Sequence, residues 1–347
     1  MAGGTGGHIF PGIAVGQALR EQGWAVHWLG APNSMEHDLV PQYDFPFEAV
    51  EFSGVRGKGL LPWVRLPWTL TRGMWQAIRV IARLKPDVVV GMGGFITVPG
   101  GLATLIIGRT MILHEQNSRA GLANRVLSWF ADRVYTAFPH VLDKGLWVGN
   151  PLRDGFIQQA SPSERFQGRS GPLSLVVVGG SLGAKALNEV LPAALEILEP
   201  NERPRVLHQS GKRHIEALDE AYANAGVVAQ TTPFIEDTAQ AFAAADLVIT
   251  RSGASTVTEI AAVGCAALFI PFPHAVDDHQ TSNAEFLVDK SAGWLMQETE
   301  LSPEALANWL RSMDRDQLLQ AALKAKALAR TGAVRAITQA CSEVIIK

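Results

Sequence analysis

Glycine-rich turns followed at once by helix-like stretches carry the residue types that bind phosphate. "AGGTGGH" opens the chain, "VVVGGSLGAKAL" begins at residue 176, and "TRSGASTVTE" begins at residue 250. Small residues let a ligand approach the backbone, and the free N–H groups at a helix start attract an anion. The second turn lacks the G-x-G-x-x-G fingerprint, and the Walker lysine pattern occurs nowhere in the chain. A purely structural tight turn is therefore an equally good interpretation of the second motif taken alone.

Side chains next to these turns could move a proton or hold a sugar. His8 directly follows the first turn, and histidine has a pKa near that of an efficient general base at neutral pH. His114, Glu115 and Asn117 end the strand-like "TMILHEQN". Glu259 lies one turn inside the helix after the third turn, where a carboxylate could accept both hydroxyls of a ribose. The competing interpretations are a structural histidine and a glutamate that only complements the helix dipole.

Two acidic stretches raise the question of a metal. The loop "PFPHAVDDHQTSNAEFL" offers His274, Asp277, Asp278 and His279, but its spacing matches no zinc signature, and sugar binding uses the same residue types. The "DRD" at residues 314–316 lies among helical residues, far from any glycine turn. We interpret it as a solvated helix start, and we expect neither a metal nor a cofactor.

Composition limits the class of protein. The chain has 347 residues, 47% apolar and 18% charged, with a formal net charge of -3. This describes an ordinary globular protein long enough for two domains, without general affinity for nucleic acid. Its two cysteines form no disulfide framework or zinc cluster, which favours a reducing cytoplasm. The uncharged residues 88–108 are as long as a membrane span, but their glycines favour a strand, a turn and a short buried helix.

One segment is both basic and aromatic. Residues 52–86 contain seven lysines and arginines and no acidic residue, with Trp63, Trp68 and Trp75 interleaved. Nucleic acid is one interpretation, and a core-facing helix with a basic outer face is another. Dense Leu, Trp and Pro better suit a bilayer interface with anionic lipids. The candidate membrane residues are Leu60, Leu61, Trp63, Arg65, Trp68 and Arg72.

Strand-like runs alternate with helical stretches along nearly the whole chain, which predicts an α/β fold with parallel, doubly wound sheets. We expect helices at 9–22, 74–84, 184–198 and 255–263. Two Rossmann-like domains facing across a cleft are expected, at residues 1–153 and 154–330, with a C-terminal helix at 331–347 packing back on the first. A sheet of this kind normally has an apolar strand running into its first glycine turn. Only Met1 and Ala2 precede that turn, so the first strand is expected to be missing, through truncation or a misassigned start.

Eight motifs together resemble one family. In order they are "AGGTGGHIFPG", "GMGGF", "LHEQN", "GNPLR", "VVGGSLGA", "HQSGK", "RSGASTVTEIAAVG" and "DDHQTSNA". They are similar to the MurG family of peptidoglycan N-acetylglucosaminyltransferases, which convert lipid I to lipid II. The resemblance covers nearly the whole chain and implies the two-domain GT-B fold. It implies an enzyme peripheral to the cytoplasmic face of the bacterial inner membrane. Its implied partners are UDP-N-acetylglucosamine, lipid I, anionic phospholipid and other cell-wall synthesis proteins.

The resemblance also implies roles for single residues. In the first half, Thr5, Gly6 and Gly7 would border the donor sugar and diphosphate, with His8 at the reacting centre and Asn117 on the N-acetylglucosamine. In the second half, Arg153 and Ser181 would lie in the nucleotide-phosphate region and Ile235 would meet uracil through its backbone. Gln280 would hold the sugar hydroxyls, and Glu259 the ribose hydroxyls. Phosphate and ribose would be held by Ala254, Ser255, Thr256, Val257, Thr258 and Glu259.

The chain departs from the family at two further positions. Phe95 stands where some relatives have tyrosine, and His279 where some have glutamine, so the role of position 279 is open. The implied reaction is an inverting single displacement in which His8 acts as base, with Glu115 and His114 as reserves. Rival functions are a transferase for another lipid acceptor, a UDP-N-acetylglucosamine 2-epimerase and a nucleotide-sugar-binding subunit without catalysis.

Overall fold

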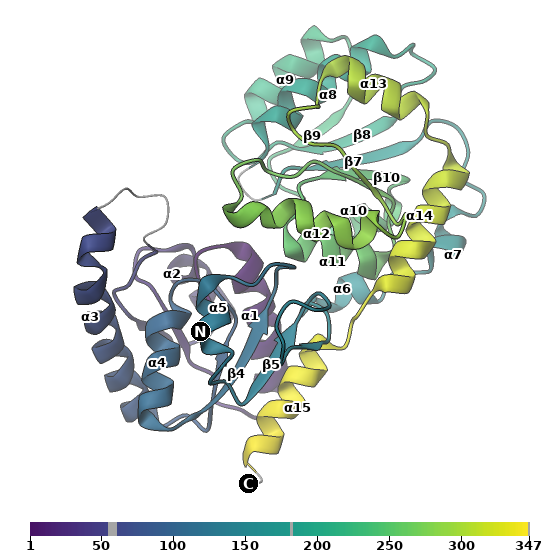
Figure 1. Cartoon of the computed structure of the whole chain (residues 1–347). Coiled ribbons are helices and arrows are strands. Elements are labelled where there is room, and N and C mark those ends of the chain that lie inside the picture. The colour runs from purple at the N-terminus through teal and green to yellow at the C-terminus, as the bar shows by residue number, and fades with distance from the viewer. Residues whose placement is uncertain (55–60, 181–182, 346–347) are drawn as a thin grey trace. The chain divides into compact units, whose positions relative to one another are not determined.

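The computed structural model describes residues 1–54, 61–180 and 183–345. The chain divides into two compact units (Figure 1): unit 1 comprises Met1–Leu152 with Arg330–Lys347, and unit 2 comprises Arg153–Ala329. These divisions fall one residue before the boundaries expected at 153/154 and 330/331. The C-terminal helix α15 (Ala333–Ile345) belongs to unit 1, where it contacts helix α1 (Gly6–Glu21) and strand β4 (Thr110–Glu115).

Unit 1 contains two parallel sheets covered by helices. One sheet has the order β1-β2, and the other has the order β3-β4-β5-β6. The remaining strands are β1 (Trp28–Gly30), β2 (Phe47–Ala49), β3 (Val88–Gly91), β5 (Arg133–Thr136) and β6 (Leu146–Trp147). The remaining helices are α2 (Met35–Leu39), η1 (Val40–Tyr43), α3 (Leu61–Leu84), α4 (Thr97–Ile107) and α5 (Leu122–Leu127).

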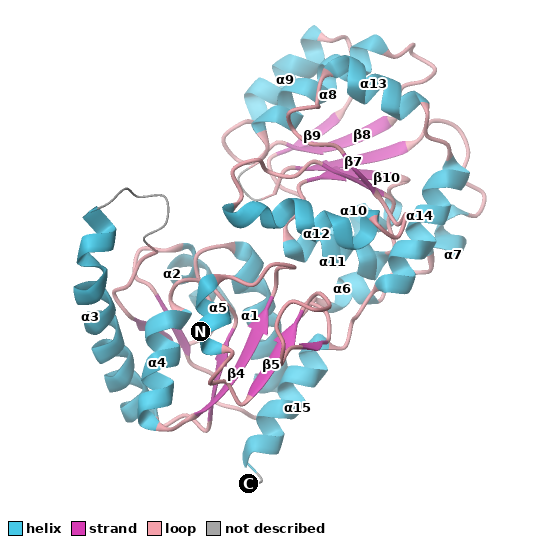
Figure 2. Ribbon diagram, in the orientation of Figure 1, coloured by secondary structure: helices cyan, strands magenta, loops and turns pink. Residues whose placement is uncertain are grey.

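Unit 2 contains one six-stranded parallel sheet with the order β12-β11-β10-β7-β8-β9, between helices (Figure 2). The strands are β7 (Ser174–Val178), β8 (Arg205–Gln209), β9 (Gln230–Thr232), β10 (Leu247–Thr250), β11 (Ala267–Phe269) and β12 (Trp294–Leu295). The helices are α6 (Asp154–Ile157), α7 (Pro162–Phe166), α8 (Lys185–Ile197), α9 (Ile215–Asn224), α10 (Thr238–Ala244), α11 (Ala254–Val263), η2 (Val276–Asp278), α12 (His279–Val288), α13 (Pro303–Arg311) and α14 (Arg315–Leu328). Counted from β7, this is the doubly wound order 3-2-1-4-5-6, whose switch point lies between β7 and β10. The predicted α/β class with parallel sheets is confirmed.

Local sequence explains where these elements begin and end. Apart from Ser174 and Thr250, β7 and its neighbour β10 consist of apolar residues that are buried on both faces, as is typical of strands in the middle of a parallel sheet. Helix α14 begins at Arg315, directly after its N-cap Asp314, whose carboxylate accepts from the Gln317 N–H in a capping box. The "DRD" stretch is therefore a helix start, as expected. Residues 88–108 form β3, a glycine turn and α4, and no helix in the described part of the chain is long and apolar enough to span a membrane.

Helix α3 is longer than the sequence predicts. We expected a helix over 74–84, but it begins at Leu61 and lies beside α4 (Figure 1). The first half of this helix was not predicted because it contains Pro62 and Pro67, and proline within a helical pattern normally indicates a break. Pro62 stands in the first turn, where no N–H bond is lost, while Pro67 lies inside the helix. The apolar stripe of Leu66, Leu70, Met74, Ala77 and Ile81 maintains the helix by packing into the unit 1 core.

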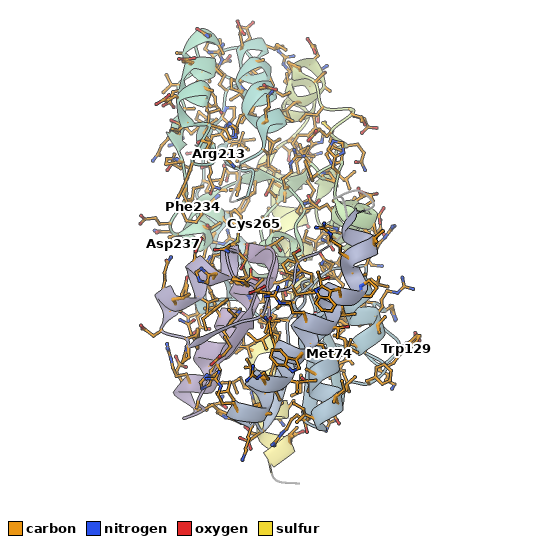
Figure 3. The ribbon with its side chains drawn as sticks, turned by 90° about the vertical axis from the view of Figure 1, so that its left-hand side faces the viewer. Met74, Trp129, Arg213, Phe234, Asp237 and Cys265 are labelled. Atoms are coloured by element: carbon orange, nitrogen blue, oxygen red, sulfur yellow. The ribbon has the colours of Figure 1, made fainter. Side chains whose placement is uncertain are left out.

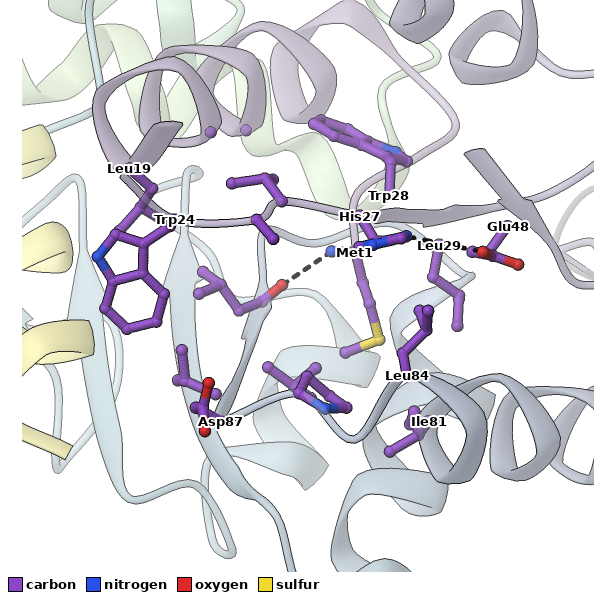
Figure 4. Close-up of a pocket in the computed structure, with 18 of the residues that line it drawn as sticks. Met1, Leu19, Trp24, His27, Trp28, Leu29, Glu48, Ile81, Leu84 and Asp87 are labelled. Atoms are coloured by element: carbon purple, nitrogen blue, oxygen red, sulfur yellow. Dashed lines mark hydrogen bonds and ion pairs between the residues drawn. The ribbon is translucent and has the colours of Figure 1, made fainter. Parts of the chain in front are cut away.

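A cavity of about 270 Å³ separates the two sheets of unit 1, between β1 and β3 (Figure 4). Met1 pairs with the backbone of β3 and of the residue after it. Its amino group donates to the Val90 carbonyl at 2.9 Å, and its carbonyl accepts from the Met92 N–H at 2.8 Å. Because ladder groups alternate in direction along a parallel strand, Leu29 and Val88 also turn their backbone groups toward the cavity. Among the described residues no strand lies between β1 and β3.

We expect one added strand to fill this cavity and stabilise unit 1. Five β-branched residues joined to Met1 would continue its ladder and bury apolar side chains, which should raise the free energy of unfolding by about 3 kcal/mol. The extension would also remove the buried amino group, whose pKa burial lowers to about 5. Urea unfolding of the chain with and without the extension measures the change. An extension of serine and glycine is the control, and equal stability for both extensions would contradict the prediction.

Candidate functional site

The second and third glycine turns meet at the switch point of the unit 2 sheet. Val178 ends β7 and pairs with Thr250, which ends β10, and the Thr250 hydroxyl donates to the Val178 carbonyl at 2.9 Å. The chain then continues into Gly179 and Gly180 on one strand and into Ser252 and Gly253 on the other. Open α/β sheets bind ligands outside the carboxyl ends of their strands at this point. Ser181, predicted to contact phosphate, lies outside the described residues.

The start of helix α11 is arranged to receive an anion. Gly253 is the N-cap and offers no side-chain cap, so the N–H groups of Ala254, Ser255 and Thr256 have no partner inside the helix. A Cβ built on Gly253 would meet nothing within 4 Å, so the backbone is open to a ligand. The buried hydroxyls of Ser252 and Ser255 have no hydrogen-bond partner among the described residues. These donors suit a phosphate group.

Glu259 has an environment unlike that of an ordinary surface carboxylate. It is the sixth residue of α11, beyond the first turn, so complementing the helix dipole does not explain it. Burial raises its pKa to about 7, opposed by the positive charge of Arg153. The Arg153 guanidinium lies over the Phe156 ring, 5.1 Å from its centroid. The Glu259 carboxylate and the Arg153 guanidinium thus lie near each other beside the start of α11. A carboxylate suits the ribose hydroxyls of a nucleotide, and a guanidinium suits its phosphates.

Not every residue of 254–259 presents its side chain to a ligand. Val257 is fully buried in the core. The Thr258 hydroxyl donates to the carbonyls of Ala254 and Ser255 at 2.9 Å. These two side chains hold the helix start in shape, and a ligand role for them would involve the backbone alone.

Two further predicted residues follow carboxyl ends of strands in the same sheet. Ile235 comes three residues after β9, and its N–H donates to Gln209 Oε1 at 3.2 Å. Gln209 in turn donates to the Gly180 carbonyl at 2.9 Å, which links the predicted uracil contact to the second glycine turn. Gln280 lies in the first turn of α12, and its side-chain oxygen accepts from the Phe272 N–H at 3.0 Å. Sequence analysis did not identify Gln209, although it stands within the quoted "HQSGK".

In unit 1 the first glycine turn leads into helix α1. Thr5 is the N-cap without a side-chain cap, and Gly6, Gly7 and His8 are the first helical residues. Glu36, fully buried, supports this turn because its carboxylate accepts from the Gly4 N–H at 3.1 Å and from the Ala31 N–H at 3.2 Å. Sequence reasoning missed Glu36, since nothing in "NSMEHD" indicates that it folds against the first turn.

His114 and Glu115 end strand β4 close to this turn, but both are enclosed. His114 is fully buried, its Nε2 lies 2.9 Å from the Gly149 carbonyl, and burial lowers its pKa to about 4. Glu115 accepts the N–H of Asn117 at 2.9 Å, the N–H of Gly121 at 3.1 Å and the amide of Asn124 at 2.9 Å. The Glu115 carboxylate therefore organises the loop that carries Asn117.

The described residues contain no cluster of three or more histidine, cysteine or acidic side chains able to hold a metal. Of the six candidate membrane residues, Leu60 lies outside the described residues. Leu61 and Trp63 belong to helix α3, and Arg65, Trp68 and Arg72 lie exposed along it. Arg72 pairs with Glu51 at 2.7 Å, an acidic partner just outside the segment that seemed free of acid.

Comparison with known proteins matches both halves of the chain. Residues 1–136 match the model of the glycosyltransferase family 28 N-terminal domain, and residues 174–340 match that of its C-terminal domain. A curated relative from Albidiferax ferrireducens is 60% identical over 99% of this chain and 90% of its own length. It is described as UDP-N-acetylglucosamine–N-acetylmuramyl-(pentapeptide) pyrophosphoryl-undecaprenol N-acetylglucosamine transferase.

Solved structures give the same result. The crystal structure of MurG from Acinetobacter baumannii is 39% identical, with a TM-score of 0.86, over 99% of this chain and 98% of that one. A putative UDP-N-acetylglucosamine 2-epimerase from Listeria monocytogenes superposes with a TM-score of 0.65 at 14% identity, over 99% and 95% of the two chains. At that identity the second likeness concerns the fold alone.

Proposed function

The chain belongs to glycosyltransferase family 28, and we propose that it transfers N-acetylglucosamine from UDP-N-acetylglucosamine to lipid I. The acceptor is the C4 hydroxyl of the N-acetylmuramic acid, and the products are lipid II and UDP. The observation that carries this proposal is the 60% identity to the Albidiferax ferrireducens transferase along nearly the full length of the chain.

A transfer assay tests the activity. The chain, UDP-N-acetylglucosamine and a soluble lipid I analogue should give an acceptor heavier by one N-acetylhexosamine, together with UDP. Diacylglycerol as acceptor and a search for free epimerised sugar examine the two rival enzyme functions. Release of epimer without any acceptor product would contradict the proposal, as would nucleotide binding without any turnover.

We assign the general base to His8. It is half-buried at the start of α1, so its imidazole remains accessible to an acceptor hydroxyl, whereas His114 and Glu115 are enclosed and engaged. The step forms a bond between the acceptor oxygen and C1 of the donor sugar and breaks the bond from C1 to the diphosphate. The hydroxyl proton passes to His8, and UDP carries away the bonding electrons.

Unit 2 supplies the stabilisation of the leaving group. The N–H groups of Ala254, Ser255 and Thr256, which have no partner inside helix α11, provide fixed positive potential for the diphosphate, and Arg153 adds a full charge. The Glu259 carboxylate holds the ribose hydroxyls, and Gln280 and Asn117 hold hydroxyl and acetamido groups of the sugar. No cofactor enters this scheme.

Because the proposed acceptor is a lipid, the outer face of α3 is a candidate membrane-binding surface. This face consists of Val64, Arg65, Trp68, Arg72, Trp75 and Arg79. Val64 is 77% exposed and Trp68 75% exposed, while the Arg79 guanidinium lies 4.4 Å from the centre of the Trp75 ring. Exposed tryptophan beside arginine is typical of helices that lie in the interface of an anionic bilayer. We propose that the outer face of α3 binds the membrane surface from which lipid I is taken.

Vesicle binding measures this directly. Replacing Arg65 and Arg79 together by glutamine should weaken binding to anionic vesicles about 30-fold, since each arginine near such a surface contributes about 1 kcal/mol. Co-sedimentation with vesicles containing phosphatidylglycerol gives the affinity. The control is Arg213→Gln, at an exposed position in unit 2 labelled in Figure 3, which should leave binding unchanged. Equal binding by the double variant, or equal binding to neutral vesicles, would contradict this use of α3.

A further inference from the structure

His8 has a hydrogen-bond partner that no sequence motif assigned to it. Gln116, 1% exposed, comes directly after strand β4, and its Oε1 lies 3.0 Å from His8 Nδ1. The other end of the same amide, Nε2, donates to the Met92 carbonyl at 2.7 Å. A chain of hydrogen bonds thus runs from the backbone after strand β3, through Gln116, to the imidazole.

The directions of these two hydrogen bonds determine which ring nitrogen of His8 carries the hydrogen. A carbonyl oxygen only accepts, so the Gln116 nitrogen must face Met92 and the Gln116 oxygen must face His8. An amide oxygen also only accepts, so His8 Nδ1 must carry the hydrogen. In the neutral ring the lone pair is then on Nε2, the nitrogen free to take a proton from a substrate.

The hydrogen bond between His8 and Gln116 requires glycine at position 93. Gly93 has a φ of +86°, and a Cβ built there would lie 2.7 Å from His8 Nδ1 and 3.0 Å from Gln116 Oε1. Any side chain at position 93 would therefore displace the bond as well as strain the backbone. Gly93 stands in "GMGGF", so three separate motifs meet at the Nδ1 side of His8.

The titratable groups on the neighbouring elements do not compete with Gln116 for the His8 imidazole. His114 on β4 is neutral at pH 7, because burial lowers its pKa to about 4, so it places no charge beside the imidazole of His8. The Glu115 carboxylate accepts from its own loop, and the Glu36 carboxylate accepts from Gly4 and Ala31. Gln116 is the group bonded to the imidazole.

We propose that Gln116 is a positioning residue that holds His8 in the Nδ1-protonated tautomer and leaves Nε2 to accept the proton of the attacking hydroxyl. Only the second part of this role, the acceptance of the hydroxyl proton by Nε2, rests on the proposed function. The tautomer itself is a property of the folded protein and can be observed without turnover.

Two variants and two readouts test this role. Gln116→Met keeps the size but removes the acceptor, so Nε2-protonated His8 should appear, and kcat should fall at least about tenfold with little change in the KM for UDP-N-acetylglucosamine. Gln116→Glu keeps an acceptor and adds charge, so Nδ1–H should persist while the acidic limb of the pH profile of kcat/KM moves to higher pH. Nitrogen-15 NMR of labelled histidine, assigned with His8→Gln, reports the tautomer.

The outcomes separate this proposal from the proposed function. An Nε2-protonated His8 in the unmodified chain would overturn it, as would a Gln116→Met variant with unchanged tautomer and unchanged kcat. If the unmodified chain shows the Nδ1–H form but transfers no sugar, the proposed function fails and the positioning role of Gln116 stands. If Gln116→Met does not fold, the direction of the pH shift in Gln116→Glu decides, and an unmoved limb overturns the proposal.

Discussion

Replacing His8 by alanine should lower kcat about 10²- to 10⁴-fold, the range that a positioned general base contributes. The KM for UDP-N-acetylglucosamine should change little, because the residues that we propose for binding the donor's nucleotide belong to unit 2. The residue is half-buried in the first turn of α1, so the substitution leaves no large cavity and should not unfold the chain. Steady-state kinetics on a soluble lipid I analogue, with thermal unfolding in parallel, measures both effects.

The matched control is His37→Ala, which removes an exposed histidine from α2 of the same unit. It should keep the activity of the unmodified chain. A His8→Ala variant with near-normal kcat would show that the hydroxyl proton goes elsewhere. His114 would remain a poor substitute, because a fully buried imidazole with a pKa near 4 binds no proton at neutral pH.

Replacing Glu259 by glutamine should weaken UDP-N-acetylglucosamine binding about 10- to 100-fold. The substitution keeps the shape of the side chain but removes the charge that would strengthen its two proposed hydrogen bonds to ribose hydroxyls, a loss of about 1 kcal/mol for each bond. Titration calorimetry gives the dissociation constant. The control Glu220→Gln, at an exposed position on α9, should bind the donor normally.

The pH dependence of donor binding gives the same residue a second signature. Burial raises the Glu259 pKa to about 7, so the carboxylate form, which we propose accepts the ribose hydroxyls, is populated mainly above that pH. Affinity should therefore rise from pH 6 to about 8 in the unmodified chain and stay flat in Glu259→Gln. The sign for stability is opposite: the free protein should lose stability as the pH rises from 4.5 through 7, and the variant should not. Parallel pH profiles for the two proteins would contradict the assignment.

Much of the fold could be predicted because the determining patterns are local. Apolar runs such as "LSLVVV" and "DLVIT" become buried parallel strands wherever helices cover both faces, and the glycine turns after them mark the carboxyl edge. Helix α3 was under-predicted because Pro62 and Pro67 resemble breaks. Its first half is maintained by tertiary packing of Leu66 and Leu70, which no local pattern contains.

The candidate site was predictable in part for a different reason. Motif residues such as His8 and Glu259 stand beside glycine turns, so their chemistry could be named from the sequence. The partners that set their behaviour come from distant segments: Gln116 lies 108 residues from His8, and Glu36 lies 32 residues from Gly4. Which end of the Gln116 amide faces His8 depends on the Met92 carbonyl, a backbone atom that carries no sequence signal.

We propose that the nucleotide of the donor binds where β7 and β10 end and α11 begins. Amide hydrogen exchange of the chain with and without UDP tests it most directly. We expect strong protection at residues 253–259 and near Gly180, and none around the cavity between β1 and β3. Protection confined to that cavity, or no protection at the start of α11 at saturating UDP, would contradict the account.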